Sequence, residues 1–289
     1  MGESLVLGSA FLWAFATVLA KPMLGQIRPG TIVAMHAWVA VLFGVILLIA
    51  LGRIPELAAI SPTQVLILGL SGTSVVVGDI FLVRSFTRLD PGKAFTAASG
   101  LFVVFTLIAG WLFIGDPVTQ VTIVSASAII LGVYMTRGGA HDAPTTAVPG
   151  STLSATPTVL LAGLMWAVGL IGFDVVIEHV DPVAGSTVGY MFPALAYVVW
   201  VMRNREFGIL SANSTNLKLL SASAAFGGLA LVGYTLGIRY ANAGIAAILE
   251  STAPIFAILL AVAFFKERIT ARTGTGVGFC AVGVAALVI

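Results

Sequence analysis

Charged side chains are scarce in this sequence. Asp, Glu, Lys and Arg together make up 9% of its 289 residues, and the net charge is only +2. A soluble domain carries about 25% charged residues, so this chain has too few charges to cover a surface that faces water. The scarcity excludes a soluble enzyme, a nucleic-acid-binding domain and a disordered tail. We therefore expect no nucleic-acid partner.

Residues that bind metals or nucleotides are also few. Cys280 is the one cysteine, which excludes a disulfide framework and a thiolate metal site. His36, His141 and His179 are too few and too far apart to make a convincing metal site. We interpret His36 first as a packing residue, with a role in proton transfer as the alternative. No Gly-Lys-Ser/Thr loop that would cradle a phosphate is present, so we predict no cofactor and no built-in ATPase.

Apolar residues, in contrast, make up 59% of the chain and gather in long runs. A helix that crosses a bilayer needs about 20 apolar residues, and proline, glycine and charge mark where such helices end. The runs that meet this criterion are residues 5–20, 32–51, 64–86, 94–114, 118–136, 158–177, 183–202, 217–238, 245–265 and 274–289. We predict an all-α membrane protein with ten transmembrane helices, embedded in the lipid bilayer.

The sequence also repeats itself with an offset of 151 residues. The residues that align without a gap at this offset include Phe113 with Phe264, Asp116 with Glu267, Thr119 with Thr270 and Gly132 with Gly283. Near the start of each half the offset is 153, which pairs Trp13 with Trp166. We predict two five-helix repeats, residues 1–137 and 158–289, joined by a cytoplasmic linker at 138–157.

Five helices are an odd number, so the second repeat must enter the membrane upside down. Inverted repeats are typical of transporters, which bind substrate near the midplane where the halves meet. Of the 14 Lys and Arg residues, only Arg53 and Arg239 fall in the even-numbered loops. Because basic residues favour the cytoplasmic side, we predict that both termini are extracytoplasmic and that the protein lies in the cell membrane.

Three segments of the second half support a family resemblance. They are Arg-Tyr-Ala-Asn-Ala-Gly at 239–244, Leu-Glu-Ser-Thr-Ala-Pro at 249–254 and Phe-Phe-Lys-Glu-Arg-Ile-Thr at 264–270. These resemble the EamA family of the drug/metabolite transporter superfamily, in its basic-aromatic helix end, its proline-bearing ninth helix and its closing acidic turn. The first half matches more loosely, because Asp116 replaces the usual Glu and Val103 stands where the second half has Pro254.

The resemblance implies a monomeric secondary carrier with a central cavity lined by helices 1–4 and 6–9. The fifth and tenth helices would support the bundle from its periphery. The resemblance favours export of amino acids or related metabolites, although family members also carry sugars, nucleobases, quaternary amines and drugs.

Two acids inside the predicted spans are candidate functional residues. An ionisable group in the hydrocarbon region costs about 2.5–3.5 kcal/mol on insertion scales, so it needs a partner or a function. Glu250 lies just before Pro254, which frees a backbone carbonyl one turn earlier. It can hold a proton or meet a substrate cation, or form a salt bridge with Arg239. Asp79 can meet substrate or make an internal contact that fixes helix packing.

Aromatic and hydroxyl side chains at similar depth complete the predicted site. Trp13 and Trp166 fall in mid-span, where each indole N–H needs an acceptor or a cavity. The predicted substrate-binding residues are Trp13, Asp79, Ser99, Phe102, Trp166, Tyr234 and Glu250. Together they predict aromatic walls with few polar groups, suited to a small amphipathic molecule or an organic cation.

We therefore predict a secondary active transporter that exports a small metabolite, an amino acid or a related amphipathic compound, by alternating access. Glu250 is predicted to couple transport to protons. The alternative is a carrier of an organic cation or a quaternary amine. A membrane-embedded enzyme or receptor is disfavoured, because the acids are scattered singly and no lysine lies in mid-span.

Overall fold

The computed structural model describes residues 1–23, 26–85, 91–135, 151–204, 213–265 and 270–288, and these residues contain helices and no strand. Seven helices are long and apolar enough to cross a membrane. They are α1 (Gly2–Ala20), α2 (Pro29–Ala50), α4 (Pro62–Ser85), α5 (Pro91–Ala109) with its π-helical extension η2 (Gly110–Ile114), α7 (Ser151–Ile177), α8 (Pro182–Asn204) and α9 (Ser214–Ile238). The prediction of an all-helical, multi-pass membrane protein is confirmed.

The remaining helices are shorter. They are η1 (Lys21–Met23), α3 (Glu56–Ala59), α6 (Gln120–Met135), α10 (Ala243–Glu250), α11 (Ala253–Phe265) and α12 (Ala271–Val288). Of these, α6, α12 and the segment from α10 into α11 are apolar enough to lie within the bilayer but fall short of a full span by length.

Local sequence signals set where several helices begin. The helices α2, α4, α5 and α8 each start at a proline, whose fixed φ and missing N–H suit the first turn. Asn213 and Asn242 cap α9 and α10 by accepting hydrogen bonds from the backbone N–H groups of Asn216 and Ile245. Asp181 accepts two such bonds at the start of α8. These ends satisfy donors that would otherwise be unpaired near a membrane surface.

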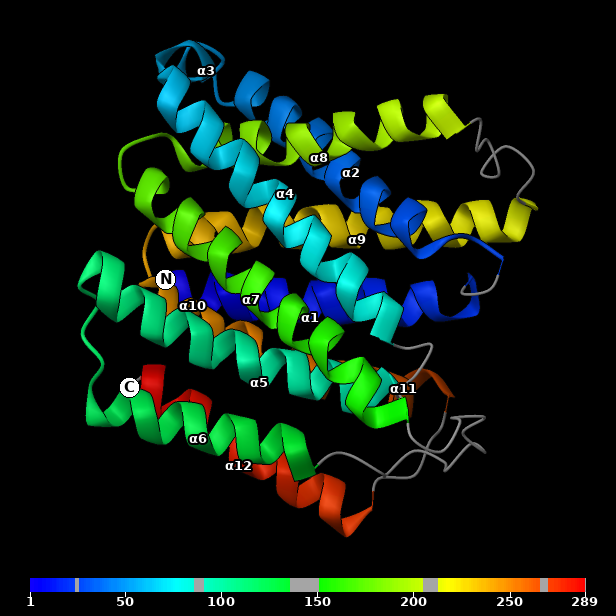
Figure 1. Ribbon diagram of the computed structural model, residues 1–289, viewed down its shortest axis with the longest axis vertical. Coiled ribbons are helices and arrows are strands. Elements are labelled where there is room, and N and C mark those ends of the chain that lie inside the picture. Colours follow the sequence, from blue (N-terminus) through cyan, green and yellow to red (C-terminus); the bar gives the residue numbers. More distant parts are fainter. Residues whose placement is uncertain (24–25, 86–90, 136–150, 205–212, 266–269, 289) are drawn as a thin grey trace.

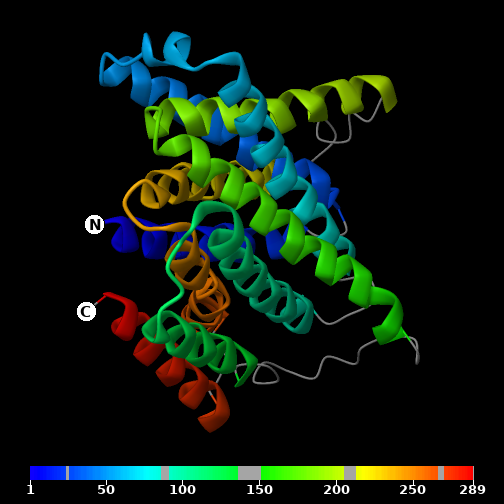
Figure 2. The same ribbon diagram turned by 60° about the vertical axis from the view of Figure 1, so that its left-hand side comes forward.

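The helices form one bundle in which α1 packs on α9, α4 packs on α7, and α2 lies against both α8 and α9. The helices α5 and α10 meet in the interior, between α7 on one side and α1 on the other. The pair α6 and α12 packs together at one edge of the bundle (Figure 1). Both termini lie at the same end of the bundle, as Figures 1 and 2 show from two directions.

The contact between α6 and α12 depends on two glycines. A Cβ atom at Gly132 would lie 2.5 Å from the carbonyl oxygen of Gly276, and one at Gly283 would lie 2.9 Å from that of Ser125. Small residues allow this close approach of two backbones within a membrane.

The structure departs from the sequence-based expectation in the segment 245–265. Instead of one helix, the chain forms α10 and α11, interrupted at Ser251 and Thr252. Pro254 has no N–H with which to continue the ladder. The hydroxyls of Ser251 and Thr252 each donate at 2.6 Å to the carbonyl oxygens of Ile248 and Leu249. The interruption is therefore satisfied by local hydrogen bonds.

Smaller departures occur at the ends of other predicted spans. The fourth span finishes in η2, and Gly115 then turns the chain in the left-handed region at φ 81°. The helix α7 begins at Ser151, inside the predicted linker 138–157, whose residues 138–150 fall outside the described ranges. The basic and acidic residues 266–268 of the family-like segment also fall outside them.

Candidate functional site

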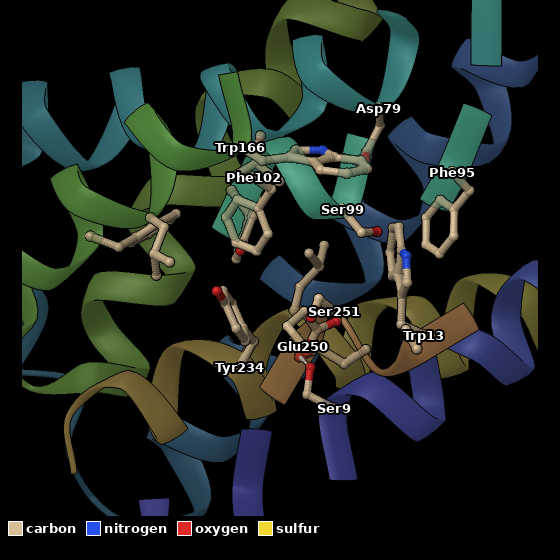
Figure 3. Close-up of a pocket in the computed structure, with 17 residues that line it drawn as sticks. Ser9, Trp13, Asp79, Phe95, Ser99, Phe102, Trp166, Tyr234, Glu250 and Ser251 are labelled. Carbon is tan, nitrogen blue, oxygen red and sulfur yellow. Dashed lines mark hydrogen bonds between the residues drawn. The ribbon is translucent and has the colours of Figure 1, made fainter. Parts of the chain in front are cut away.

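All seven residues predicted from the sequence line one cavity in the interior of the bundle (Figure 3). They come from six helices: α1 (Trp13), α4 (Asp79), α5 (Ser99, Phe102), α7 (Trp166), α9 (Tyr234) and α10 (Glu250). The space open to the centres of water-sized molecules is about 80 Å³, enough for several waters. The cavity thus brings together side chains from both predicted halves of the chain.

One wall is built around Trp166. Its Nε1–H donates to Oδ1 of Asp79 at 2.9 Å, which ties α7 to α4. Phe102 and Phe95 contact the indole edge to face, with ring centroids 6.0 and 6.2 Å away. A Cβ atom on Gly78 would lie 2.6 Å from the indole ring, so glycine leaves the room that this ring fills. Asp79 therefore makes the internal contact that the sequence allowed, and it also faces the cavity.

The opposite wall contains Trp13, the repeat mate of Trp166. Its ring meets that of His36 nearly at right angles, with centroids 5.3 Å apart. His36 Nε2 lies 3.1 Å from the hydroxyl oxygen of Ser223, which itself donates to the carbonyl oxygen of Ala16. Because that hydroxyl uses its hydrogen on Ala16, we assign the proton to His36 Nε2. His36 thus lies buried behind Trp13, and its Nδ1 has no hydrogen-bond partner among the described residues.

Glu250 lies at the end of α10, directly before the interruption of the helix. Ser9 and Ser251 are close to it in Figure 3. Its Oε2 is buried and has no hydrogen-bond partner among the described residues. Arg239, the alternative partner, donates instead to the carbonyl oxygen of Ile177 at 2.6 Å. The part of the chain that the structure describes contains no ion pair between Arg239 and Glu250.

Tyr234 adds a second unsatisfied group to the same cavity. Its hydroxyl oxygen is buried without a partner in the described ranges, and it points into the space beside Phe102 in Figure 3. Buried polar atoms are nearly always hydrogen-bonded, and leaving one unpaired costs about 1–3 kcal/mol. Two such atoms facing one cavity indicate a place for a polar ligand or for water.

The described side chains that line the cavity include acidic groups and no basic ones. Among the 17 side chains that line the cavity, Asp79 and Glu250 are the ionisable carboxyls, and Lys, Arg and His do not occur in the set. The rest are aromatic, aliphatic or hydroxyl-bearing.

Comparison with known proteins identifies the chain. The sequence profile of the EamA-like transporter family matches residues 1–138 and again residues 153–289. The chain belongs to the EamA-like transporter family. The resemblance proposed from segments 239–244, 249–254 and 264–270 is thereby confirmed.

The family assigns this EamA-like protein to the membrane transporters of small molecules. A protein of known crystal structure superimposes with a TM-score of 0.80, covering 99% of this chain and 96% of that chain at 16% sequence identity. At this identity the likeness shows a shared fold. No curated protein matches the sequence.

Sequence reasoning missed several residues that line the cavity of this EamA-like transporter. Ser9 lies four positions before Trp13, and residues at that spacing share a helix face. Ser251 follows Glu250 directly, and Phe173 lies seven positions after Trp166, again on one face. Helical spacing from the predicted residues was therefore a usable signal for Ser9 and Phe173, but not for Ser251.

Proposed function

We propose that this EamA-like protein is a secondary active transporter that exports a small amphipathic metabolite from the cell by alternating access. Amino acids and related compounds are the substrate class that the resemblance favours, and organic cations are the alternative. The observation that carries the proposal is the convergence of seven side chains on one cavity that contains two unpaired polar atoms.

The proposed architecture is ten membrane-crossing segments in two inverted repeats, residues 1–137 and 158–289, with the linker 138–157 between them. The family profile matches the chain twice, which supports this division. Helix packing supports it as well, because contacts occur in matched pairs: α1 on α9 with α7 on α4, and α2 on α9 with α8 on α4. The pairs α2 with α8 and α6 with α12 would lie on the axis that relates the halves.

Residue-level contacts repeat in the same way. Thr119 and Thr122 share a hydrogen bond of 2.9 Å, and their repeat mates Thr270 and Thr273 share one of the same length. Gly132 faces Gly276, and its mate Gly283 faces Ser125, which is the mate of Gly276 at the offset of 151. Such reciprocal contacts are what two copies related by a twofold axis produce.

The orientation proposed is that both termini face the outside. The bases at described helix ends far from the termini include Arg28, Arg84, Arg203, Lys218 and Arg272, whereas Arg53 and Arg239 lie at the end that holds the termini. This distribution supports a cytoplasmic position for the end away from the termini. We also propose that the protein acts as a monomer in the cell membrane.

Glu250 is the proposed coupling residue. It ends a half-helix, and interrupted helices in transporters place ion and substrate groups at such ends. Because its Oε2 has no partner among the described residues, it is available to exchange a proton for a contact with substrate during the cycle. The interruption at Ser251 and Thr252 gives α10 and α11 a point about which to move.

Counterflow in proteoliposomes tests the proposed transport. Vesicles loaded with one of a panel of amino acids, amines, nucleobases or sugars should take up the same labelled compound from outside. Trp13→Ala and Glu250→Gln should reduce this exchange by at least about tenfold if these side chains contact substrate. Glu56→Gln, which alters an exposed acid in α3, is the matched control and should exchange normally. A protein that acts as an enzyme or a receptor would exchange none of the panel.

A further inference from the structure

The charges in the cavity bear on the chemistry of its ligand. Among the described residues, its lining contains the carboxyls of Asp79 and Glu250 and no basic side chain. A ligand carboxylate would therefore meet two acids without a counter-charge, in a medium where burying an unpaired charge is very unfavourable. A ligand cation would find acceptors there.

Backbone donors do not replace the missing basic side chains. A helix N-terminus can bind a carboxylate, and α11 begins beside the cavity at Ala253. However, the N–H groups of Ile255 and Phe256 donate to the carbonyl oxygen of Thr252, and Pro254 has no N–H. The first turn of α11 therefore has few N–H groups left to donate to a ligand carboxylate.

The N–H groups just before α11 are also occupied. Those of Ser251 and Thr252 donate to the carbonyl oxygens of Ala247 and Leu249. The indole N–H of Trp166 is taken by Asp79. These three donors therefore already have acceptors.

Other features of the cavity favour a cation. The half-helix α10 ends at Glu250, so the negative end of its dipole and the carboxyl lie at the same place. Aromatic rings from both walls surround this space, including Trp13, Phe102 and Tyr234. Faces of such rings attract ammonium groups, most strongly where water is excluded.

We propose that the site binds an organic amine in its ammonium form, with a compact apolar body and no free carboxylate. Glu250 provides the counter-charge, and Asp79 positions Trp166 as part of the wall. This narrows the proposed function, on which it rests, from amphipathic metabolites in general to amines. It also selects against zwitterionic amino acids, the class that the family resemblance favoured.

A matched ligand series tests this directly on the wild-type protein in proteoliposomes at neutral pH. Phenylalanine, phenethylamine and 3-phenylpropionate share one body but are zwitterionic, cationic and anionic. Leucine, isopentylamine and 4-methylpentanoate repeat the comparison with an aliphatic body. Each is measured as a competitor of counterflow and by quenching of tryptophan fluorescence.

We expect both amines to bind at least about tenfold more tightly than the matching amino acids, and the acids not to bind. Glu250→Gln should weaken amine binding by at least about 30-fold, whereas Glu250→Asp should retain the preference for amines. Glu56→Gln should behave as wild type. Circular dichroism and a single peak in size exclusion confirm that each variant is folded.

The outcomes separate the two proposals. Tighter binding of phenylalanine and leucine than of their amines overturns this inference and leaves the proposed transport intact. Amine binding that Glu250→Gln does not weaken overturns the role of Glu250 as counter-charge. Exchange of none of the six compounds overturns this inference, and exchange of none of the wider panel of amino acids, amines, nucleobases and sugars overturns the proposed function as well.

Discussion

The fourth and ninth apolar segments align at an offset of 151 residues, yet they differ in structure and in chemistry. In the first, α5 runs without interruption past Ser99 and Val103. In the second, the equivalent positions are Glu250 and Pro254, and the chain divides into α10 and α11. Ser99 and Glu250 face the same cavity. The two copies thus share a scaffold, while the ionisable group and the helix interruption belong to the second copy alone.

The two mid-span tryptophans also differ, in the side chains that hold them. Trp166 is held by a hydrogen bond to the carboxylate of Asp79 in α4. Trp13 is held by ring contact with His36 in α2, which is fixed in turn by Ser223. An acid therefore stands behind one wall and a histidine behind the other. The two rings thus occupy positions that align at an offset of 153 residues, but different side chains support them.

The largest effect should come from substituting Glu250, and a much smaller one from substituting Ser99, the residue that aligns with it. Glu250→Gln should abolish accumulation driven by a pH gradient, because it removes the carboxyl that we propose as the coupling group, whereas the other lining carboxyl, Asp79, accepts the hydrogen bond of Trp166. Ser99→Ala removes one hydroxyl and should change the rate by less than about fivefold. Uptake into proteoliposomes with an imposed pH gradient measures both. Equal losses in the two variants would mean that the halves contribute alike to coupling.

Among the described residues, the helix interruption occurs in the second copy and not in the first. It can be tested with two variants, Val103→Pro and Pro254→Val. Val103 is fully buried, and Val103→Pro would remove a hydrogen bond inside α5, costing about 3 kcal/mol or more of stability. Pro254→Val should instead raise stability and slow exchange, because α10 and α11 can then join. Thermal unfolding in detergent and exchange rates provide the readouts. A Pro254→Val protein that is less stable and equally fast would show that the interruption serves packing alone.

Removing the hydrogen bond between Asp79 and Trp166 should lower the stability of the protein by a smaller amount. Asp79→Ala removes the acceptor of the Trp166 N–H, and a typical intramolecular hydrogen bond contributes about 0.5–1.5 kcal/mol. Trp166→Phe removes the donor, and the double variant should lose little more than either single one. Unfolding of all four proteins gives a double-mutant cycle. Fully additive losses would show that the contact contributes no net stability.

The smallest effect concerns Asp116, in the turn between η2 and α6. Burial raises the pKa of this carboxyl, the N–H of Gly244 partly offsets that shift, and the negative charge of Glu178 adds to it. Because the pKa of Asp116 is higher in the folded state than in the unfolded chain, ionisation of this carboxyl destabilises the folded protein. This destabilisation is absent below the unfolded pKa of about 3.9 and fully present above the folded pKa, so stability from this group falls as pH rises.

Asp116→Asn should remove this dependence and raise the melting temperature slightly at neutral pH. Asn can still accept the hydrogen bond from Gly244, so the local structure should be retained. Melting curves between about pH 4 and pH 8, compared with the wild type, measure the difference. A variant with an unchanged pH profile would show that Asp116 ionises as freely in the folded protein as in the unfolded chain.

The sequence was most informative where a residue is rare in its surroundings. Asp79, Glu250 and the two mid-span tryptophans are conspicuous in apolar segments because each needs a partner there, and all four line the cavity. Serine is common in membrane helices, so Ser9 carried no such signal, although its spacing from Trp13 did. The apolar runs predicted the helical, membrane-embedded fold for the same reason, since lipid leaves few alternatives to a helix.

What the sequence did not predict depends on distant contacts. Pro254 marks a missing N–H, but whether a helix bends or divides there depends on other acceptors and donors, here the hydroxyls of Ser251 and Thr252. The contact of Trp13 with His36 requires α1 to lie beside α2 and α9 at one register. The hydrogen bond from Gly244 to Asp116 joins the two halves, and no local pattern encodes such a pairing.

Proton release on ligand binding tests the central claim, that the second copy carries the one coupling acid, most directly. The purified protein in a weakly buffered detergent solution with a pH-sensitive dye is mixed with phenethylamine at neutral pH. If Glu250 holds a proton in the empty site and releases it to solution when the ammonium ion binds, about one proton per protein molecule is released. Glu250→Gln should release none, whereas Ser99→Ala should release as much as the wild type. Binding without release, or release that persists in Glu250→Gln, would contradict the account.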